Sequence, residues 1–323
     1  YTLDKRIVMT LDAGGTNFVF SAMQGGEEIV QPVRLPAEAD NLDASLTNLI
    51  DGFEKVKRQL SQAPVAISFA FPGPADYERG IIGDLGNLPA YRGGVALGPM
   101  LEEQFNLPVL INNDGDLFAY GEAIGGYLNE VNELMKQGYS PKRYNNLLGI
   151  TLGTGFGAGK VSSGNLYKGD NSAAGEIWLM RHKLESGMNA EEGASIRAVR
   201  RFYAEAIGKR LEEAPSPKDI YEIAEGRLDG DQSAARRAYE KMGEVVGDAI
   251  ANAITLLDGI IVIGGGLAGA HHLFLPSVVD ELNSHFTAPD GSEINRLVMK
   301  AYNLEDDQQR ALFQRGQVKE IQV

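Results

Sequence analysis

The chain has 323 residues, 43% of them hydrophobic, which is enough for two domains or for one large α/β unit with a full core. Its 30 Lys and Arg against 44 Asp and Glu give a formal net charge of -14, which argues against a surface that binds nucleic-acid phosphates. Because the chain has no cysteine, disulfides, zinc fingers and iron–sulfur clusters are excluded. We find no run of about 18 apolar residues and no signal peptide, so we expect a cytoplasmic protein without a membrane segment.

Strands and helices alternate in the first half of the chain. Two apolar runs flank a glycine turn near the start, which predicts a β-hairpin. Apolar residues then recur at steps of three and four after Asn41, which predicts a helix capped by this residue. The predicted elements are a hairpin over residues 7–23, a helix over 41–62 and strands over 65–71 and 108–111. Polar residues follow both later strands, at the sheet edge where open α/β proteins bind ligands.

The second half repeats this layout. It opens with another strand, glycine turn and returning strand, which indicates a weak internal duplication. The predicted elements are a hairpin over residues 147–161, helices over 192–206, 218–225 and 231–257, and a strand over 260–263. Residues 127–146 are polar and predict a surface insertion of helix plus loop. The stretch after Asn303 is charged and rich in glutamine, so we expect the closing apolar helix of this half to be missing from these residues.

The two hairpin turns are candidates for binding phosphates. Each contains glycine and threonine, and Asp12 directly precedes the first turn. Backbone N–H groups in such turns form concave anion sites, and glycine allows a close approach. The alternative is a pair of ordinary hairpin turns. Neither is a P-loop, because no Gly-Lys-Ser/Thr follows and each turn leads into a strand.

A third glycine cluster, Gly264 to Gly266, follows a strand and formally matches the dinucleotide fingerprint G-x-G-x-x-G. A dehydrogenase would need an acidic residue at the end of a second strand about 20 positions later. Residues 283–286 provide none, so we rank this alternative last. A turn packed against a nucleotide base or ribose explains the same glycines.

Asn113 and Asp114, at the end of the predicted strand 108–111, are the best candidates for acid–base chemistry. An aspartate held beside an amide at a strand end can accept a proton from a positioned hydroxyl. The alternative is an Asx turn that caps the next helix. Four further candidates could contact a polyhydroxylated ligand, although each alone is more typical of a solvated surface: Gly73, Asn87, Glu176 and Glu191.

Taken together, these motifs resemble the ROK family of sugar kinases and sugar-responsive repressors, in the superfamily of hexokinase and actin. Their order and spacing agree with the family from about residue 6 to 285. The matching motifs are DAGGTN from Asp12, FPGP from Phe71, GNLP from Gly86, NNDGDLFAYGE from Asn112, LGTGFG from Leu152, AGE from Ala174 and IVIGGGL from Ile261.

The resemblance implies a fold and a chemistry. The fold is a two-domain, actin/hexokinase-like (ribonuclease H-like) α/β fold with an interdomain cleft, with domains over residues 1–115 and 116–323. The chemistry is phosphoryl transfer from ATP, with Mg²⁺, to a hexose such as glucose. The resemblance also implies a cytoplasmic homodimer.

The resemblance implies a role for each motif residue. Asp114 is the general base, and Asp12 helps to place Mg²⁺ through water. The expected sugar contacts are Gly73, Asn87, Asn113, Asp114, Glu176 and Glu191. The expected nucleotide contacts are Asp12, Gly14, Gly15, Thr16, Asn17, Gly153, Thr154, Gly155, Gly264, Gly265 and Gly266.

The sequence departs from the family pattern at the zinc loop. Family members carry a histidine where this chain has Leu179, followed by a cysteine-rich zinc loop, whereas residues 180–190 contain no cysteine. We therefore expect no zinc site, and we assign no ligand role to His182. Only eleven residues precede Asp12, so we expect no DNA-binding domain and no repressor. The main alternative to a hexose kinase is a sugar-binding sensor of the same fold without catalysis.

Overall fold

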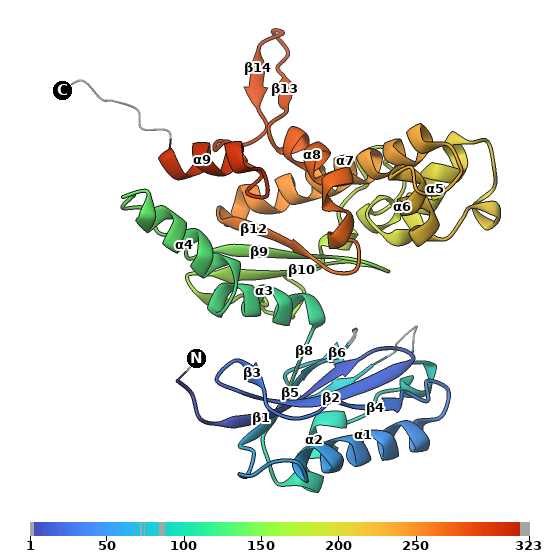
Figure 1. Cartoon of the computed structure of the whole chain (residues 1–323), viewed down its shortest axis with the longest axis vertical. Helices are drawn as coiled ribbons and strands as arrows, with labels where there is room; N and C mark the ends of the chain where they lie inside the picture. Colours follow the sequence, from blue (N-terminus) through green and yellow to red (C-terminus); the bar gives the residue numbers. More distant parts are fainter. Residues whose placement is uncertain (1–2, 72, 74, 84–87, 317–323) are drawn as a thin grey trace. The chain divides into compact units, whose positions relative to one another are not determined.

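The computed structural model describes all residues except 1–2, 72, 74, 84–87 and 317–323 (Figure 1). The chain divides into two compact units, residues 1–117 and 118–323, which we call unit 1 and unit 2. Each unit has its own sheet and its own hydrophobic core. None of the helices in the described part of the chain is long and apolar enough to cross a membrane.

Unit 1 is built on a sheet with the strand order β3-β2-β1-β5-β8, in which β4 also pairs with β2. The strands are β1 (Ile7–Ala13), β2 (Asn17–Gln24), β3 (Glu27–Glu28), β4 (Val33–Pro36), β5 (Ala66–Ala70) and β8 (Val109–Asn112). Strand β1 is antiparallel to β2 and parallel to β5, and β5 is parallel to β8. The carboxyl ends of β1, β5 and β8 therefore share one edge, as the sequence predicts.

Two helices cover one face of this sheet (Figure 1). Helix α1 (Leu42–Lys57) packs on β2 and β4, and α2 (Leu97–Phe105) packs on β8. The predicted cap of α1 is confirmed, because the side chain of Asn41 accepts a hydrogen bond from the backbone N–H of Ala44 at 3.1 Å. Aromatic rings fill the core, with Phe20 and Phe53 edge to face at 5.0 Å between centroids. A short hairpin of β6 (Ala75–Asp76) and β7 (Ile81–Ile82) and the 3-10 turn η1 (Pro89–Tyr91) complete the unit.

Unit 2 repeats the arrangement of β1, β2 and β5. Its sheet has the order β11-β10-β9-β12, with β9 antiparallel to β10 and parallel to β12. The strands are β9 (Leu147–Leu152), β10 (Phe156–Ser162), β11 (Asn165–Leu166) and β12 (Ile260–Gly264). A hairpin followed by a strand parallel to its first strand thus occurs in both units, which confirms the duplication predicted from the sequence.

Helices cover both faces of the unit 2 sheet (Figure 1). The helices are α3 (Asp114–Ile124), α4 (Tyr127–Gln137), α5 (Ile196–Ala206), α6 (Pro217–Ala224), α7 (Gln232–Leu257), α8 (His271–Leu282) and α9 (Asp307–Arg315). Strand β9 is buried on both faces, and a Cβ at Gly149 would lie 2.7 Å from Cα of Ala119 in α3. Only glycine therefore allows α3 to approach the sheet this closely. A separate hairpin of β13 (His285–Thr287) and β14 (Glu293–Asn295) carries exposed residues only.

Three regions differ from the sequence prediction. The helix predicted over residues 192–206 is split into a 3-10 turn, η3 (Ala190–Gly193), and α5, because the backbone is extended at Ser195 and the N–H of Ile196 donates to the carbonyl of Gly153 instead. The predicted surface insertion has the expected helix and loop, but α4 buries three apolar side chains, of which Leu128 and Val131 belong to a core cluster with residues of the sheet. The stretch after Asn303 contains α9, which the sequence did not predict and which has no buried residue.

Candidate active site

The first glycine turn joins β1 to β2 in unit 1. The N–H of Gly14 donates to the carbonyl of Asn17 at 3.1 Å and closes the turn. A Cβ at Gly14 would lie 3.0 Å from that oxygen, so a side chain would press on the turn. One neighbouring segment supports it, because the N–H of Ala37 donates to the carbonyl of Thr16 at 3.0 Å. The exposed residues here are Asp12, Gly14, Gly15 and Thr16.

The candidate base lies where β8 ends and α3 begins. The N–H of Gly115 donates both to Oδ1 of Asn113 at 2.8 Å and to Oδ1 of Asp114 at 2.9 Å. The carbonyl of Asn113 accepts from the N–H of Leu117 at 3.0 Å. Asn113 therefore forms the Asx-type cap that was the alternative interpretation, whereas the carboxylate of Asp114 stays exposed to solvent. Both residues lie at the carboxyl edge of the sheet, where a ligand can reach them.

The remaining unit 1 candidates belong to the two predicted sugar loops. Gly73 is exposed, and a Cβ there would lie 2.8 Å from the hydroxyl of Tyr77. This hydroxyl donates to the carbonyl of Phe71 at 3.0 Å and accepts from Nδ2 of Asn113 at 3.4 Å. Asn87 lies outside the described residues. The structure thus brings Gly73 and Asn113 together around Tyr77, a residue for which the sequence carried no signal.

Unit 2 brings the other two glycine clusters together. The N–H of Gly153 donates to the carbonyl of Gly155 at 3.0 Å, which closes the second glycine turn. Gly265 has φ +91°, and a Cβ there would lie 2.8 Å from the backbone nitrogen of Leu152. The carbonyl of Leu152 also accepts from the N–H of Leu267 at 3.0 Å. The second turn and the turn at Gly264 to Gly266 are therefore neighbours, as a nucleotide spanning both would require.

The two acidic candidates of unit 2 differ in their surroundings. Oε2 of Glu191 accepts from the N–H of Phe156 at 3.1 Å, and a Cβ at Gly155 would lie 2.9 Å from the same oxygen. Glu191 is thus fixed against the second glycine turn. Glu176 is exposed at the start of η2 (Ile177–Leu179), and its carboxylate accepts from the indole N–H of Trp178.

The loop over residues 180–190 is organised by a buried imidazole. His182 is 1% exposed, and its Nδ1 accepts from the N–H of Leu184 at 3.1 Å and of Glu185 at 3.0 Å. Burial lowers the pKa of His182 below its usual value. In the described part of the chain, no three His, Asp or Glu side chains are grouped so that they could hold a metal ion. The sequence predicts no ligand role for His182, and the structure gives its Nδ1 two backbone amides as partners.

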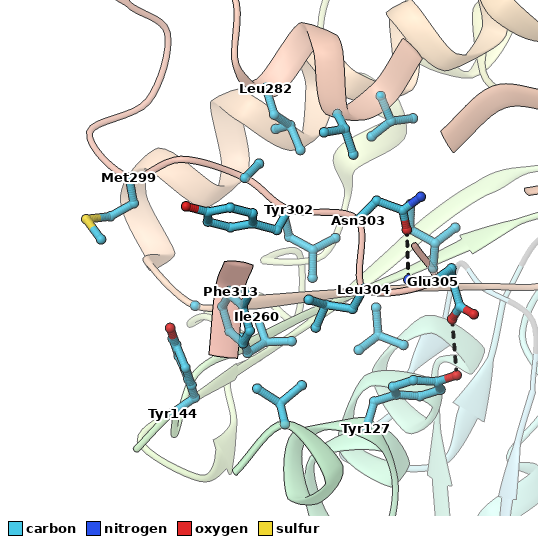
Figure 2. A pocket seen from close by; sticks show the side chains of 18 of the residues that line it. Tyr127, Tyr144, Ile260, Leu282, Met299, Tyr302, Asn303, Leu304, Glu305 and Phe313 are labelled. Atoms are coloured by element: carbon cyan, nitrogen blue, oxygen red, sulfur yellow. Dashed lines mark hydrogen bonds between the residues drawn. The ribbon is translucent and has the colours of Figure 1, made fainter. Parts of the chain in front are cut away.

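Unit 2 also contains a cavity of about 690 Å³, between α4, β12, α8 and residues 299–316 (Figure 2). Its lining is largely apolar, and Tyr127 and Glu305 form a hydrogen bond of 3.3 Å at one side. None of the predicted site residues lines this cavity. The lining does include Ile263 and Ala268, on either side of the turn at Gly264 to Gly266.

Comparison with known proteins identifies the family. The family model described as the ROK family matches residues 8–308, which is most of the chain. The chain belongs to the ROK family. This ROK protein is 28% identical over 313 residues to a glucokinase of Halalkalibacterium halodurans, covering 88% of this chain and 87% of the relative. It is 27% identical over 281 residues to an N-acetyl-D-glucosamine kinase of Photobacterium profundum, covering 81% and 85%.

Solved structures agree with this assignment. The ROK protein matches the crystal structure of a glucokinase from Parabacteroides distasonis with a TM-score of 0.89 and 56% identity, covering all of this chain and 88% of that chain. A glucokinase from Streptomyces griseus in complex with glucose and AMPPNP matches with a TM-score of 0.64 at 19% identity, which shows the fold alone; the two chains are covered to 86% and 88%. The predicted family and the two-domain hexokinase-like fold are confirmed. The protein is a ROK family sugar kinase.

Proposed function

We propose that the protein transfers the γ-phosphoryl group of ATP to a hexose hydroxyl that Asp114 deprotonates. The observation that supports this most is the exposed Asp114 carboxylate at the carboxyl edge of the unit 1 sheet, beside a fixed Asn113 amide. A protein that only binds sugar needs no base beside the acceptor hydroxyl. The glucokinase and N-acetylglucosamine kinase relatives support a sugar as the acceptor.

Each group has a separate task in this proposal. Asp114 accepts the proton of the attacking hydroxyl as the bond to phosphorus forms, which is the role of a general base. The phosphates lie against the first turn, Gly14, Gly15, Thr16 and Asn17, and against the second turn, Gly153, Thr154 and Gly155. The N–H groups of Gly14 and Gly153 close the two turns, so the phosphate oxygens bind to the other N–H groups of the turns. Gly264, Gly265 and Gly266 flank the adenosine. Such preorganised donors accelerate transfer because they stabilise developing charge without reorganising.

The residues present fit a magnesium ion that accompanies the nucleotide. Mg²⁺ prefers carboxylate and water oxygens and commonly keeps several waters. Asp12 offers an exposed carboxylate at the end of β1, directly before the first glycine turn. We therefore assign Asp12 to the hydrated ion, which neutralises phosphate charge when it is bound.

For the acceptor we propose glucose or a related hexose. Gly73, Asn113, Glu176 and Glu191 would contact its hydroxyls, together with Asn87, which lies outside the described residues. Leu179 replaces the histidine expected in the family and is 59% exposed, so the contact at this position differs from the family pattern. The homodimer implied by the resemblance stays a prediction, which light scattering in solution tests.

The test is ADP release with MgATP over a panel of hexoses, amino sugars and ketoses. We expect sugar-dependent ADP formation that requires Mg²⁺, with glucose or a 2-amino-substituted glucose among the best acceptors. Binding of a sugar without ADP release, measured by calorimetry, would favour the sensor instead. No release and no binding with any sugar would contradict the proposal.

A further inference from the structure

We infer that Tyr77 is a positioning residue for the sugar site, because its hydroxyl fixes the side-chain amide of Asn113 next to the base. This inference rests on the proposed function, in which Asn113 contacts the sugar and Asp114 is the base. It concerns a residue outside the family motifs quoted above, and its supporting contacts all lie within unit 1.

The backbone hydrogen bonds between β5 and β8 hold these two strands together only up to their last residues. The N–H of Phe71 donates to the carbonyl of Asn112 at 3.0 Å, one position beyond β5. Past this point the chain turns into the loop at Gly73 on one side and into α3 on the other. A further hydrogen bond is needed to fix the position of the chain at Gly73 relative to the start of α3.

The hydroxyl of Tyr77 supplies this bond. It donates to the carbonyl of Phe71 at 3.0 Å and accepts from Nδ2 of Asn113 at 3.4 Å. At its other end, the amide of Asn113 accepts from the N–H of Gly115 at 2.8 Å. The amide is therefore held at both its oxygen and its nitrogen, which fixes its rotation and its orientation.

Tyr77 is itself held by a rigid hairpin. The residue follows β6, and its carbonyl accepts from the N–H of Gly80 at 3.3 Å, which closes the turn into β7. Gly80 has φ +65° and touches Gly98 in the first turn of α2, where the N–H of Gly98 donates to the carbonyl of Gly80 at 2.9 Å. A Cβ at Gly80 would lie 2.8 Å from Cα of Gly98. The hairpin is thus fixed to α2, and from it the hydroxyl of Tyr77 reaches the carbonyl of Phe71 and the amide of Asn113.

The same contact explains why position 73 carries glycine. A Cβ at Gly73 would lie 2.8 Å from the hydroxyl oxygen of Tyr77, closer than real Cβ atoms approach. Gly73 therefore lies against the hydroxyl of Tyr77, which also contacts the amide of Asn113 beside Asp114. The N–H of Gly115 is shared between the side chains of Asn113 and Asp114, so a rotated Asn113 would also disturb the base.

Tyr77→Phe tests the inference, because it removes the hydroxyl and keeps the ring. We expect kcat/KM for the best sugar of the panel to fall about tenfold, the scale of one hydrogen bond, while KM for ATP stays within about twofold. The matched control is Tyr127→Phe in unit 2, which removes the hydroxyl bond of 3.3 Å to Glu305 at the apolar cavity, away from all predicted site residues. This control should leave both kinetic constants unchanged.

A double-mutant cycle shows whether Tyr77 acts through Asn113. In an Asn113→Ala background, adding Tyr77→Phe should change kcat/KM for the sugar by less than about twofold, since the group that it positions is gone. A full tenfold loss in that background would overturn the inference, as would wild-type kinetics for Tyr77→Phe alone. Those outcomes leave the proposed function intact. If the wild type neither phosphorylates nor binds any sugar of the panel, the proposed function fails and this inference fails with it.

Discussion

The two glycine turns look alike in sequence and differ in how the fold supports them. In the described part of the chain, the first turn itself accepts one bond from a neighbouring segment, from the N–H of Ala37 to the carbonyl of Thr16, and its flanking residues Asp12 and Asn17 pair with β5 and β4. The second turn is supported from three sides: by Gly265 packed on Leu152, by the N–H of Ile196 on the carbonyl of Gly153, and by Glu191 on the N–H of Phe156.

This difference teaches that similar anion-binding turns can be preorganised to different degrees. A turn fixed by three neighbours keeps its N–H groups aimed at a ligand before the ligand arrives. A turn with one neighbour bond can adjust as phosphate binds. Substitutions distant in sequence, such as those near Glu191 or Gly265, should therefore affect the second turn more than remote substitutions affect the first.

The largest effect on kcat is expected for Asp114, the proposed base of the reaction for which both turns bind the phosphates. Asp114→Asn removes the proton acceptor and keeps the shape of the side chain, so we expect kcat to fall about 10²- to 10⁴-fold. Steady-state kinetics on the best sugar of the panel measures this. Wild-type turnover in the variant would show that the turns do not serve a reaction at Asp114.

The support of the second turn is tested by Gly265→Ala. The new Cβ would overlap the backbone of Leu152, the residue before the turn, so we expect KM for ATP to rise about tenfold or more. The matched control is Gly26→Ala: Gly26 has a similar φ of +88°, but no atom lies within 4 Å of the new Cβ. The Gly26→Ala variant should therefore show only the cost of a side chain at positive φ, about 1–2 kcal/mol of backbone strain, and no steric overlap. Equal effects of the two variants on KM for ATP would contradict the role of Gly265.

A smaller effect on KM is expected at Leu179, three residues after the proposed sugar contact Glu176. A leucine cannot pair with a sugar hydroxyl, so Leu179→His should lower KM for glucose by about tenfold or less without added zinc. The control is Leu184→His, at another exposed leucine in the following loop. Unchanged KM values for every sugar would show that position 179 does not face the ligand.

The smallest expected effect is a pH dependence of the free energy of unfolding, caused by His182 in the loop over residues 180–190. The pKa of His182 is lowered in the folded state by burial, with Glu185, Glu192 and Arg201 as the charged neighbours. Its contribution to the free energy of unfolding is therefore complete above about pH 6.5 and is lost as the pH falls through the lowered pKa. Wild type should lose more stability between about pH 7.5 and 5.5 than His182→Asn, whose Oδ1 keeps an acceptor near the place of Nδ1.

Denaturant unfolding at the two pH values measures this difference. All other residues are the same in the two proteins, so their contributions cancel in the comparison. Elemental analysis of protein purified without added metal accompanies it, because we expect no zinc in this loop. Equal pH dependence in the two proteins, or stoichiometric zinc with a lower melting temperature on chelation, would contradict this account.

Local sequence by itself determined the order and type of most elements. Alternating apolar runs around glycine specified both hairpins, and the spacing after Asn41 specified α1 together with its cap. The position of Asp114 after β8 was equally local. These features depend on side-chain periodicity and on turn chemistry within a few residues, which a single sequence displays.

Only the tertiary structure decided what supports these motifs. Tyr77 meets Asn113 across 36 positions, and Glu191 meets Phe156 across 35. The helix predicted from Glu192 likewise begins only at Ile196, whose N–H donates to the distant carbonyl of Gly153. Such contacts depend on how sheet, helices and loops pack, and neither periodicity nor motif spacing records which distant side chain will fill the space beside a turn.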